Sequence, residues 1–233
     1  MRNLPIVSRY ILWANIIVFL LDMVFRRAGI QLSDVCGLHY FTAQQFHIWQ
    51  PFTYMFLHAD LGHIFCNMFA VLMFAPVLER EWGWKRFLTY YLVCGVGAGL
   101  VQEAVWALMY QPTLSAMATA QAAYYINPLV TIGASGAVFG ILAAFAWLFP
   151  EQKIFLLFIP IPIPARWFVG MYAVLELFGG VASVSGDNIA HFAHLGGMIT
   201  GLLILWYWKN KNNRRFRKYE SKDYSGYHYK DPS

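Results

Sequence analysis

Three polar side chains lie within long apolar stretches of the sequence and could carry out chemistry together: Ser135, His194 and His63. Ser135 belongs to the segment Gly-Ala-Ser-Gly at 133–136 and begins an apolar run that ends at Pro150. A serine hydroxyl becomes a good nucleophile when an adjacent base, often a histidine, takes its proton. If the chain brings Ser135 against His194, the two side chains have the composition of a nucleophile and its general base.

The composition of the chain indicates the environment that must hold these groups. Of its 233 residues, 59% are apolar and only 12% are charged, and the mean hydropathy is +0.47, whereas soluble domains carry about 25% charged residues. Six apolar segments are read as membrane spans, at 10–25, 56–78, 87–109, 135–149, 165–181 and 189–208. We therefore expect an all-α, polytopic membrane protein with a six-span membrane domain at 1–208 and a basic tail at 209–233.

The positive charges predict which way the spans run. The net charge is +5, and eight of the 17 Lys and Arg residues follow Trp208. The N-terminus, the second and fourth loops and the tail hold 15 of the 17, while the other loops hold only Arg26 and Arg27. By the positive-inside rule, both termini face the cytoplasm. The basic tail is typical of a segment beside anionic membrane lipid, and we expect no nucleic-acid partner.

The lengths of the spans predict that the three side chains lie at a similar depth. The helix at 135–149 has 15 residues, which gives about 22 Å against a bilayer core of about 30 Å. With Pro150 at one face, Ser135 lies about 8 Å below the outer face. His63 comes about seven residues into the second span and His194 about five residues into the sixth. Polar groups at such depths are costly and usually functional.

Small residues at helical spacing predict which spans touch. They are Gly136 and Gly140 in the fourth span, and Gly197 and Gly201 in the sixth. Glycine stripes allow two helix backbones to approach closely, and His194 lies on the stripe of the sixth span. Packing through these stripes would bring Ser135 to His194. His63 and Asn67 are four residues apart and share one face of the second span.

A third member of the pair is not indicated. Asp187 precedes His194 by seven residues, or about 10.5 Å along a helix, and is read as a helix cap. Glu176 is an acid inside the fifth span, but nothing in the sequence links it to His194, so a Ser–His dyad is expected. His191 and His58 are interpreted as structural or solvated groups near the membrane surface.

The connecting segments carry expectations of their own. The first loop, at 26–53, is polar and aromatic and is long enough to fold on the membrane surface. The third loop, at 110–132, carries no charge, and we expect it to dip into the bilayer and deliver Ser135 at depth. The alternating prolines at 159–164 exclude a regular helix there.

Three motifs in these spans resemble the rhomboid family of intramembrane serine proteases. They are His-Ala-Asp-Leu-Gly-His-Ile-Phe-Cys-Asn at 58–67, Gly-Ala-Ser-Gly at 133–136 and Ala-His-Leu-Gly-Gly-Met-Ile-Thr-Gly at 193–201. Their order, spacing and span number match the family pattern, and the resemblance covers most of the chain, from the first span to the sixth. It implies a six-transmembrane-helix rhomboid-like bundle.

The resemblance also implies roles for particular residues. Ser135 and His194 match the family's catalytic dyad, and His63 and Asn67 match its oxyanion-stabilising pair. Phe139 matches an aromatic position that packs against the catalytic imidazole. The implied activity is a serine-type endopeptidase that needs no cofactor and cleaves single-span membrane proteins near their outer end, after a small residue.

Two other functions remain open at this stage. The first is a catalytically inactive rhomboid-like protein that binds membrane clients. The second is a metal or proton transporter that uses the histidines, although the cysteines, Cys36, Cys66 and Cys94, have unrelated spacings and no metal site is indicated. A chain without a transit peptide favours the inner membrane of a bacterial cell as its location.

Overall fold

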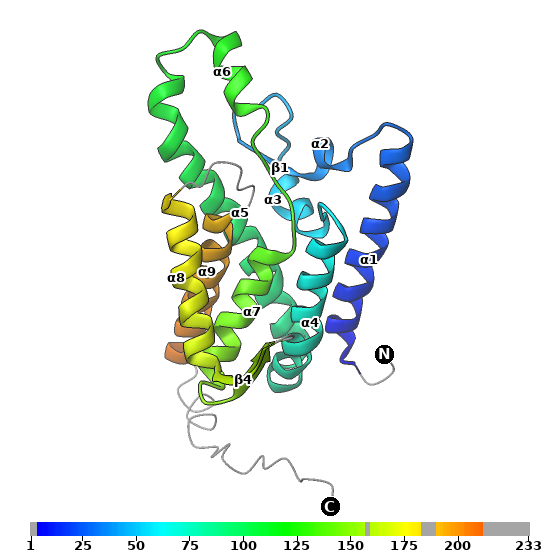
Figure 1. Cartoon of the computed structure of the whole chain (residues 1–233), viewed down its shortest axis with the longest axis vertical. Coiled ribbons are helices and arrows are strands. Elements are labelled where there is room, and N and C mark those ends of the chain that lie inside the picture. Colours follow the sequence, from blue (N-terminus) through cyan, green and yellow to red (C-terminus); the bar gives the residue numbers. More distant parts are fainter. Residues whose placement is uncertain (1–3, 157–158, 183–189, 212–233) are drawn as a thin grey trace, which may run out of the picture.

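Helices that run along the long axis of the molecule dominate the structure, a computed structural model that describes residues 4–156, 159–182 and 190–211 (Figure 1). Six of them correspond to the predicted spans: α1 (Ile6–Arg27), α4 (Leu61–Trp82), α5 (Trp84–Leu114), α7 (Ser135–Leu148), α8 (Ala165–Ala182) and α9 (His191–Lys211). Within the described ranges, α1, α4, α5 and α8 are each long and apolar enough to cross a membrane, and α7 is a shorter apolar helix. The expected all-α, polytopic membrane bundle is confirmed.

Helix α7 lies at the centre of the bundle (Figure 1). It packs against α4, α5, α8 and α9, and ten of its 14 residues are buried. Because α7 carries no charged residue, it can be enclosed on all sides without leaving a charge unpaired. The outer helices instead expose large apolar side chains, as a lipid-facing surface requires; these include Leu20, Leu72, Leu100, Phe178 and Leu203.

Helix α4 begins later than the sequence predicted, at Leu61 instead of residue 56. Residues Tyr54–Phe56 form a separate 3-10 helix, η1. Asp60 then caps α4, because its Oδ1 accepts a hydrogen bond from the backbone N–H of His63 at 2.9 Å and so satisfies a free donor of the first turn. His63 therefore lies in the first turn of α4, not about seven residues into a span.

The first loop folds, as expected, and contains α2 (Leu32–Cys36), β1 (Leu38–His39) and α3 (Gln50–Thr53) before η1. The fully buried Gln50 holds it together. Its side chain accepts from the backbone N–H of His39 and donates to the carbonyls of Val35 and Gln45. Arg26 fixes the end of the loop by donating to the carbonyl of Ala59 at 3.1 Å.

The third loop differs from its prediction. Helix α5 continues to Leu114, and α6 (Thr119–Ile126) lies beyond the end of the bundle (Figure 1), so the segment as a whole does not dip between the spans. Strand β2 (Val130–Thr131) then pairs antiparallel with β1. The chain descends from β2 into the bundle, where the backbone N–H of Gly133 donates to the carbonyl of Tyr54 at 3.0 Å.

The opposite end of the bundle carries a short hairpin of β3 (Lys153–Leu156) and β4 (Ile159–Pro164). Its second strand contains the alternating prolines, which confirms that this segment is not helical. Prolines are tolerated there because each strand of a two-stranded sheet has a free edge. Helix α9 continues to Lys211. The predicted cap at Asp187 and most of the predicted tail, 212–233, lie outside the described residues.

Candidate active site

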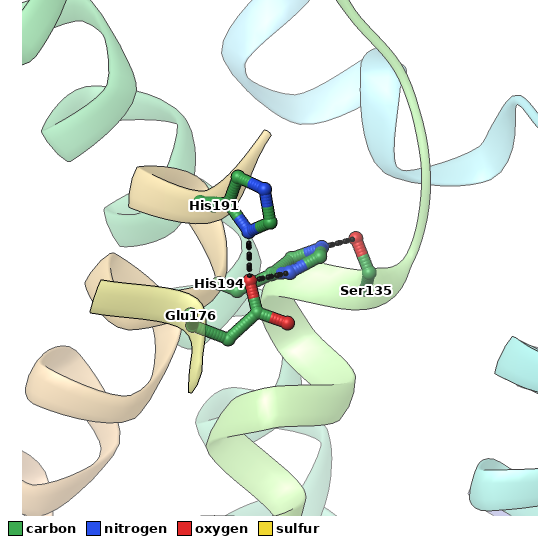
Figure 2. A network of polar contacts seen from close by, with 4 residues as sticks. All are labelled: Ser135, Glu176, His191 and His194. Atoms are coloured by element: carbon green, nitrogen blue, oxygen red, sulfur yellow. Dashed lines mark hydrogen bonds and ion pairs between the residues drawn. The ribbon is translucent and has the colours of Figure 1, made fainter. Parts of the chain in front are cut away.

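Ser135 and His194 lie in direct contact at the beginning of two adjacent helices (Figure 2). Ser135 is the first residue of α7, and His194 lies in the first turn of α9. The Nε2 atom of His194 is 2.8 Å from the Oγ of Ser135, a normal hydrogen-bond distance. The two side chains that the sequence predicted to meet therefore do so, and both are partly buried.

The glycines of α7 and α9 explain why the two side chains can meet. A Cβ atom on Gly197 would collide with the carbonyl oxygen of Gly136, and one on Gly140 would lie 2.7 Å from Cys94 and 3.2 Å from the carbonyl of Gly197. No larger residue fits at this approach without moving a backbone. Tyr90 of α5 adds a hydrogen bond from its hydroxyl to the carbonyl of Gly140 at 2.7 Å. The predicted glycine-faced packing is confirmed.

Aromatic rings hold the plane of the His194 imidazole. Phe139, one turn after Ser135, stacks on it with ring centroids 4.3 Å apart and an interplanar angle of 11°. Tyr172 of α8 stacks on Phe139 in turn, at 5.2 Å and 5°. The expected packing of Phe139 against the imidazole is confirmed, and the stack joins α9, α7 and α8 at the site.

Glu176 joins the pair, contrary to the expectation that nothing links it to His194. Its Oε2 lies 2.9 Å from the Nδ1 of His194 and 2.6 Å from the Nδ1 of His191 (Figure 2). The available signal was an acid inside a span, which needs a partner, together with two histidines three residues apart on one helix face. The structure thus contains a continuous chain of contacts from Ser135 through His194 to Glu176.

This chain of contacts defines a chemically sensible protonation pattern. An ionised Glu176 accepts hydrogen bonds only, so the Nδ1 of His194 carries the hydrogen and donates it. The Nε2 of the neutral ring then has a free lone pair, to which the Ser135 hydroxyl donates. The arrangement can remove a proton from Ser135 and stabilise the resulting imidazolium.

His63 lies against the turn that precedes Ser135. A Cβ atom on Gly133 would lie 2.8 Å from the Nε2 of His63 and 3.5 Å from the Oγ of Ser135, and the φ of Gly133 is +132°. Both the close approach and the backbone angle require glycine. The Nδ1 of His63 accepts a hydrogen bond from the backbone N–H of Ala59 at 3.4 Å. The Nε2 of His63 is therefore the hydrogen-bearing nitrogen, and it faces the turn.

Asn67 lies one helical turn beyond His63 on α4, which packs against α7. Its side chain is 5% exposed, and its Nδ2 has no hydrogen-bond partner among the residues that the structure describes. A buried donor without a partner costs about 1–3 kcal/mol. The Nδ2 of Asn67 can therefore donate to an oxygen that a bound substrate brings to the site.

His58 belongs to the structural surroundings of the site. It is fully buried before the start of α4, and its ring packs edge-on against that of His63 at 5.0 Å. Burial, helped by the neighbouring His63, lowers the pKa of His58 to about 3, so this ring is neutral at physiological pH. Among the described residues, no three His, Cys, Asp or Glu side chains are placed to hold a metal ion.

Comparison with known proteins reveals similarity over the region that contains all of these residues. The family model "Rhomboid domain" matches residues 45–211. The chain is 32% identical over 152 residues to Rhomboid protein 1, mitochondrial, of Saccharomyces cerevisiae, which covers 65% of this chain and 39% of that protein. It is 29% identical over 211 residues to RHOMBOID-like protein 12, mitochondrial, of Arabidopsis thaliana, covering 88% of this chain and 58% of that protein.

A bacterial relative is matched over more of its own length. The chain is 28% identical over 172 residues to Putative rhomboid protease YdcA of Bacillus subtilis, covering 72% of this chain and 71% of that protein. The chain thus spans less than two thirds of the yeast and plant relatives, at 39% and 58% of their lengths. The similarity bears on the membrane bundle and not on the remainder of those longer proteins.

Proposed function

Because this chain belongs to the rhomboid family, we propose that it is an intramembrane serine endopeptidase with Ser135 as the nucleophile and His194 as the base. One observation carries the proposal: the hydrogen bond of 2.8 Å between Ser135 and His194 at the start of two helices of an apolar bundle. A serine hydroxyl paired with an imidazole is a costly arrangement in a membrane protein, and its chemical use is the activation of the hydroxyl.

In the first half of the reaction, the Nε2 of His194 takes the hydroxyl proton as the Oγ of Ser135 attacks the carbonyl carbon of a peptide bond. The tetrahedral intermediate collapses when the C–N bond breaks and His194 gives that proton to the leaving amine. The products of this half are an acyl-enzyme on Ser135, which holds the N-terminal part of the substrate, and the released C-terminal part with a new free amino group. No redox partner or cofactor takes part in this step.

The negative oxygen of the intermediate needs hydrogen-bond donors, and we assign three. The backbone N–H of Ser135 is one of the first amides of α7, a helix that begins without a side-chain cap in the described structure. The unpartnered Nδ2 of Asn67 and the Nε2–H of His63 supply the others. Each such donor contributes about 3 kcal/mol to the stability of the transition state.

In the second half, water replaces the leaving amine. His194 removes a proton from the water as the water oxygen attacks the acyl carbon. His194 then gives this proton to the Oγ of Ser135 when the C–O bond of the ester breaks. The second product is a carboxylic acid, which loses its remaining proton to water, and the enzyme regains its first state. The site must therefore admit water from the outer side of the membrane.

The substrate that fits such a site is a transmembrane segment of another membrane protein, and we propose a single-span protein that unwinds near its outer end. It would enter between α4 and α8. Helix α8 is the least buried of the four long apolar helices, and few of its residues must give up contacts when a second chain comes alongside. Membrane lipid surrounds the remaining faces.

The orientation in the membrane follows from the distribution of positive charge. We propose that both termini lie in the cytoplasm of a bacterial cell, that residues 209–233 form a basic tail there, and that the site opens toward the outside. Cleavage would then occur near the outer end of the substrate span. A membrane-impermeant thiol reagent tests this on a variant in which the three free cysteines, Cys36, Cys66 and Cys94, are replaced by Ala and one cysteine is added after residue 211. That cysteine should react only in disrupted cells.

The experiment that tests the activity uses purified protein in liposomes with a model single-span substrate. Wild type should cleave it, while Ser135→Ala and His194→Ala should each lose at least about a thousandfold in rate. Cleavage at the wild-type rate by either variant contradicts the assignment of these residues. Tight substrate binding without cleavage by wild type would instead favour an inactive rhomboid-like protein that binds membrane clients.

A further inference from the structure

We propose that Glu176 is a positioning residue for His194, so that Ser135, His194 and Glu176 work as a triad, with His191 holding the carboxylate in place. The inference deepens the proposed function and rests on it. Figure 2 shows the geometry: one oxygen of Glu176 faces the imidazoles of His191 and His194, and the imidazole of His194 also faces Ser135. The distances from Oε2 are 2.9 Å to His194 and 2.6 Å to His191.

The position of Glu176 on α8 points to a specific use. Ala165, Val169 and Glu176 are the buried residues of this helix, and Glu176 is the charged one among them. A carboxylate is expensive inside a membrane bundle unless donors surround it. Two Nδ1–H donors on one oxygen supply this compensation, and both come from the helix that carries the candidate base.

The stack with Phe139 does not fix the ring flip or the tautomer of His194, and Glu176 can fix both. Ring stacking fixes the plane of the His194 imidazole, but it does not distinguish the two ring flips or the two tautomers, because both keep the same flat surface. A hydrogen bond from Nδ1–H to Glu176 selects one flip and one tautomer. The Nε2 lone pair then faces Ser135 in essentially every molecule.

The charge of Glu176 gives a second contribution. When His194 accepts the serine proton, it becomes a cation 2.9 Å from an ionised carboxylate. Attraction across this distance favours the imidazolium that forms in the transition state. Among the described residues, Phe139 and Ser135 face His194 from α7, and His63 faces it from α4. His191 of α9 lies 6.5 Å away, ring to ring, with its Nδ1 on the same oxygen of Glu176. None of these groups is an anion, so Glu176 supplies the negative charge beside the imidazole.

A purely structural reading makes different predictions. Glu176 would then only fasten α8 to α9, and its bond to His191 would serve this purpose as well as its bond to His194. Substituting His191 removes one fastening without touching the Ser135–His194 contact. The comparison of Glu176 and His191 variants therefore separates positioning from fastening.

The experiment uses the full chain in liposomes with a model single-span substrate, from pH 5 to pH 9. Glu176→Gln should lower kcat by about 10²–10³-fold with KM changed less than about threefold. The acidic limb of its kcat profile should move to lower pH, because the imidazolium has lost its anionic partner. Glu176→Asp should restore part of kcat, and His191→Gln should lose less than about tenfold with no shift of the limb.

Controls keep the two proposals separable. Glu151→Gln removes a carboxylate that pairs with Arg166 near the β3–β4 hairpin, and it should behave as wild type. The positioning role is wrong if Glu176→Gln keeps kcat within about threefold of wild type. It is also wrong if the acidic limb of the Glu176→Gln kcat profile stays at its wild-type pH while His191→Gln loses as much activity as Glu176→Gln. The proposed function survives that outcome as long as Ser135→Ala is inactive; a Ser135→Ala protein as active as wild type removes both proposals.

Discussion

The carbonyl oxygen of Gly136 on α7 lies directly against Gly197 on α9, so closely that no side chain fits between the two helices. This backbone contact lies within one helical turn of the hydrogen bond between Ser135 and His194. Since the two side chains project from the same turns that make the contact, the approach of the helices sets their separation. The chemistry at this site therefore depends on glycines that take no part in it.

Replacing Gly197 by Ala should open the helix pair and weaken the site. The added methyl group must displace the carbonyl of Gly136, and overpacking of this kind costs about 1–3 kcal/mol. We expect a lower thermal midpoint in detergent and a drop in kcat of at least about tenfold, measured by scanning fluorimetry and by substrate cleavage.

Gly170→Ala is the matched control for this prediction. A Cβ atom on Gly170 of α8 would meet nothing within 4 Å, so the change should be neutral or slightly stabilising, by about 0.5–1 kcal/mol. Equal effects of the two glycine substitutions would contradict the role given to the α7–α9 approach.

Asn67→Ala should slow catalysis without unfolding the protein. Because the Nδ2 of Asn67 has no partner in the described structure, its removal costs little stability. The loss of one oxyanion donor lowers kcat by about 10²–10³-fold. Cleavage kinetics and the thermal midpoint should be recorded on the same preparation. A variant with wild-type kcat would remove Asn67 from the oxyanion site.

Phe139→Ala should loosen the His194 imidazole, whose plane now depends on a stack with centroids 4.3 Å apart. We expect the rate of substrate cleavage to fall by roughly tenfold, since a freely rotating base is less often aligned with Ser135. Phe139→Tyr keeps the ring and should retain most of the rate. If the alanine and tyrosine variants react alike, the stack does not matter for catalysis.

His58 should make stability depend on pH. The pKa of His58 is about 3 in the folded chain, whereas an unfolded histidine titrates near about 6.5. Below that pH the unfolded state binds a proton that the folded state does not, so stability falls as the pH decreases toward 3. At pH 4.5 the loss relative to pH 7.5 is at most about 2.7 kcal/mol.

The measurement is the thermal midpoint in detergent at pH 7.5 and pH 4.5, for wild type and His58→Gln. Glutamine does not titrate, so the midpoint of the variant should drop less between the two values. An identical drop in both proteins would show that His58 is not the group that responds.

The helix bundle and the Ser135–His194 contact could be predicted from local patterns in the sequence. The length of each apolar segment indicates a span, and the spacing of glycines indicates the two helix faces that meet. The contact of Glu176 was missed because it depends on how α8 is rotated about its axis, and no stripe of small residues marks that rotation. The pairing of β1 with β2 was missed as well. Two residues per strand carry no alternation, and Leu38 and Thr131 are paired from distant parts of the chain.

Active-site labelling tests the central claim most directly. Purified wild type, incubated with a fluorophosphonate in liposomes, should gain one adduct, which peptide mass spectrometry should locate on Ser135, and His194→Ala should label far more slowly. An adduct on another residue, or equal labelling of wild type and Ser135→Ala, would contradict the account.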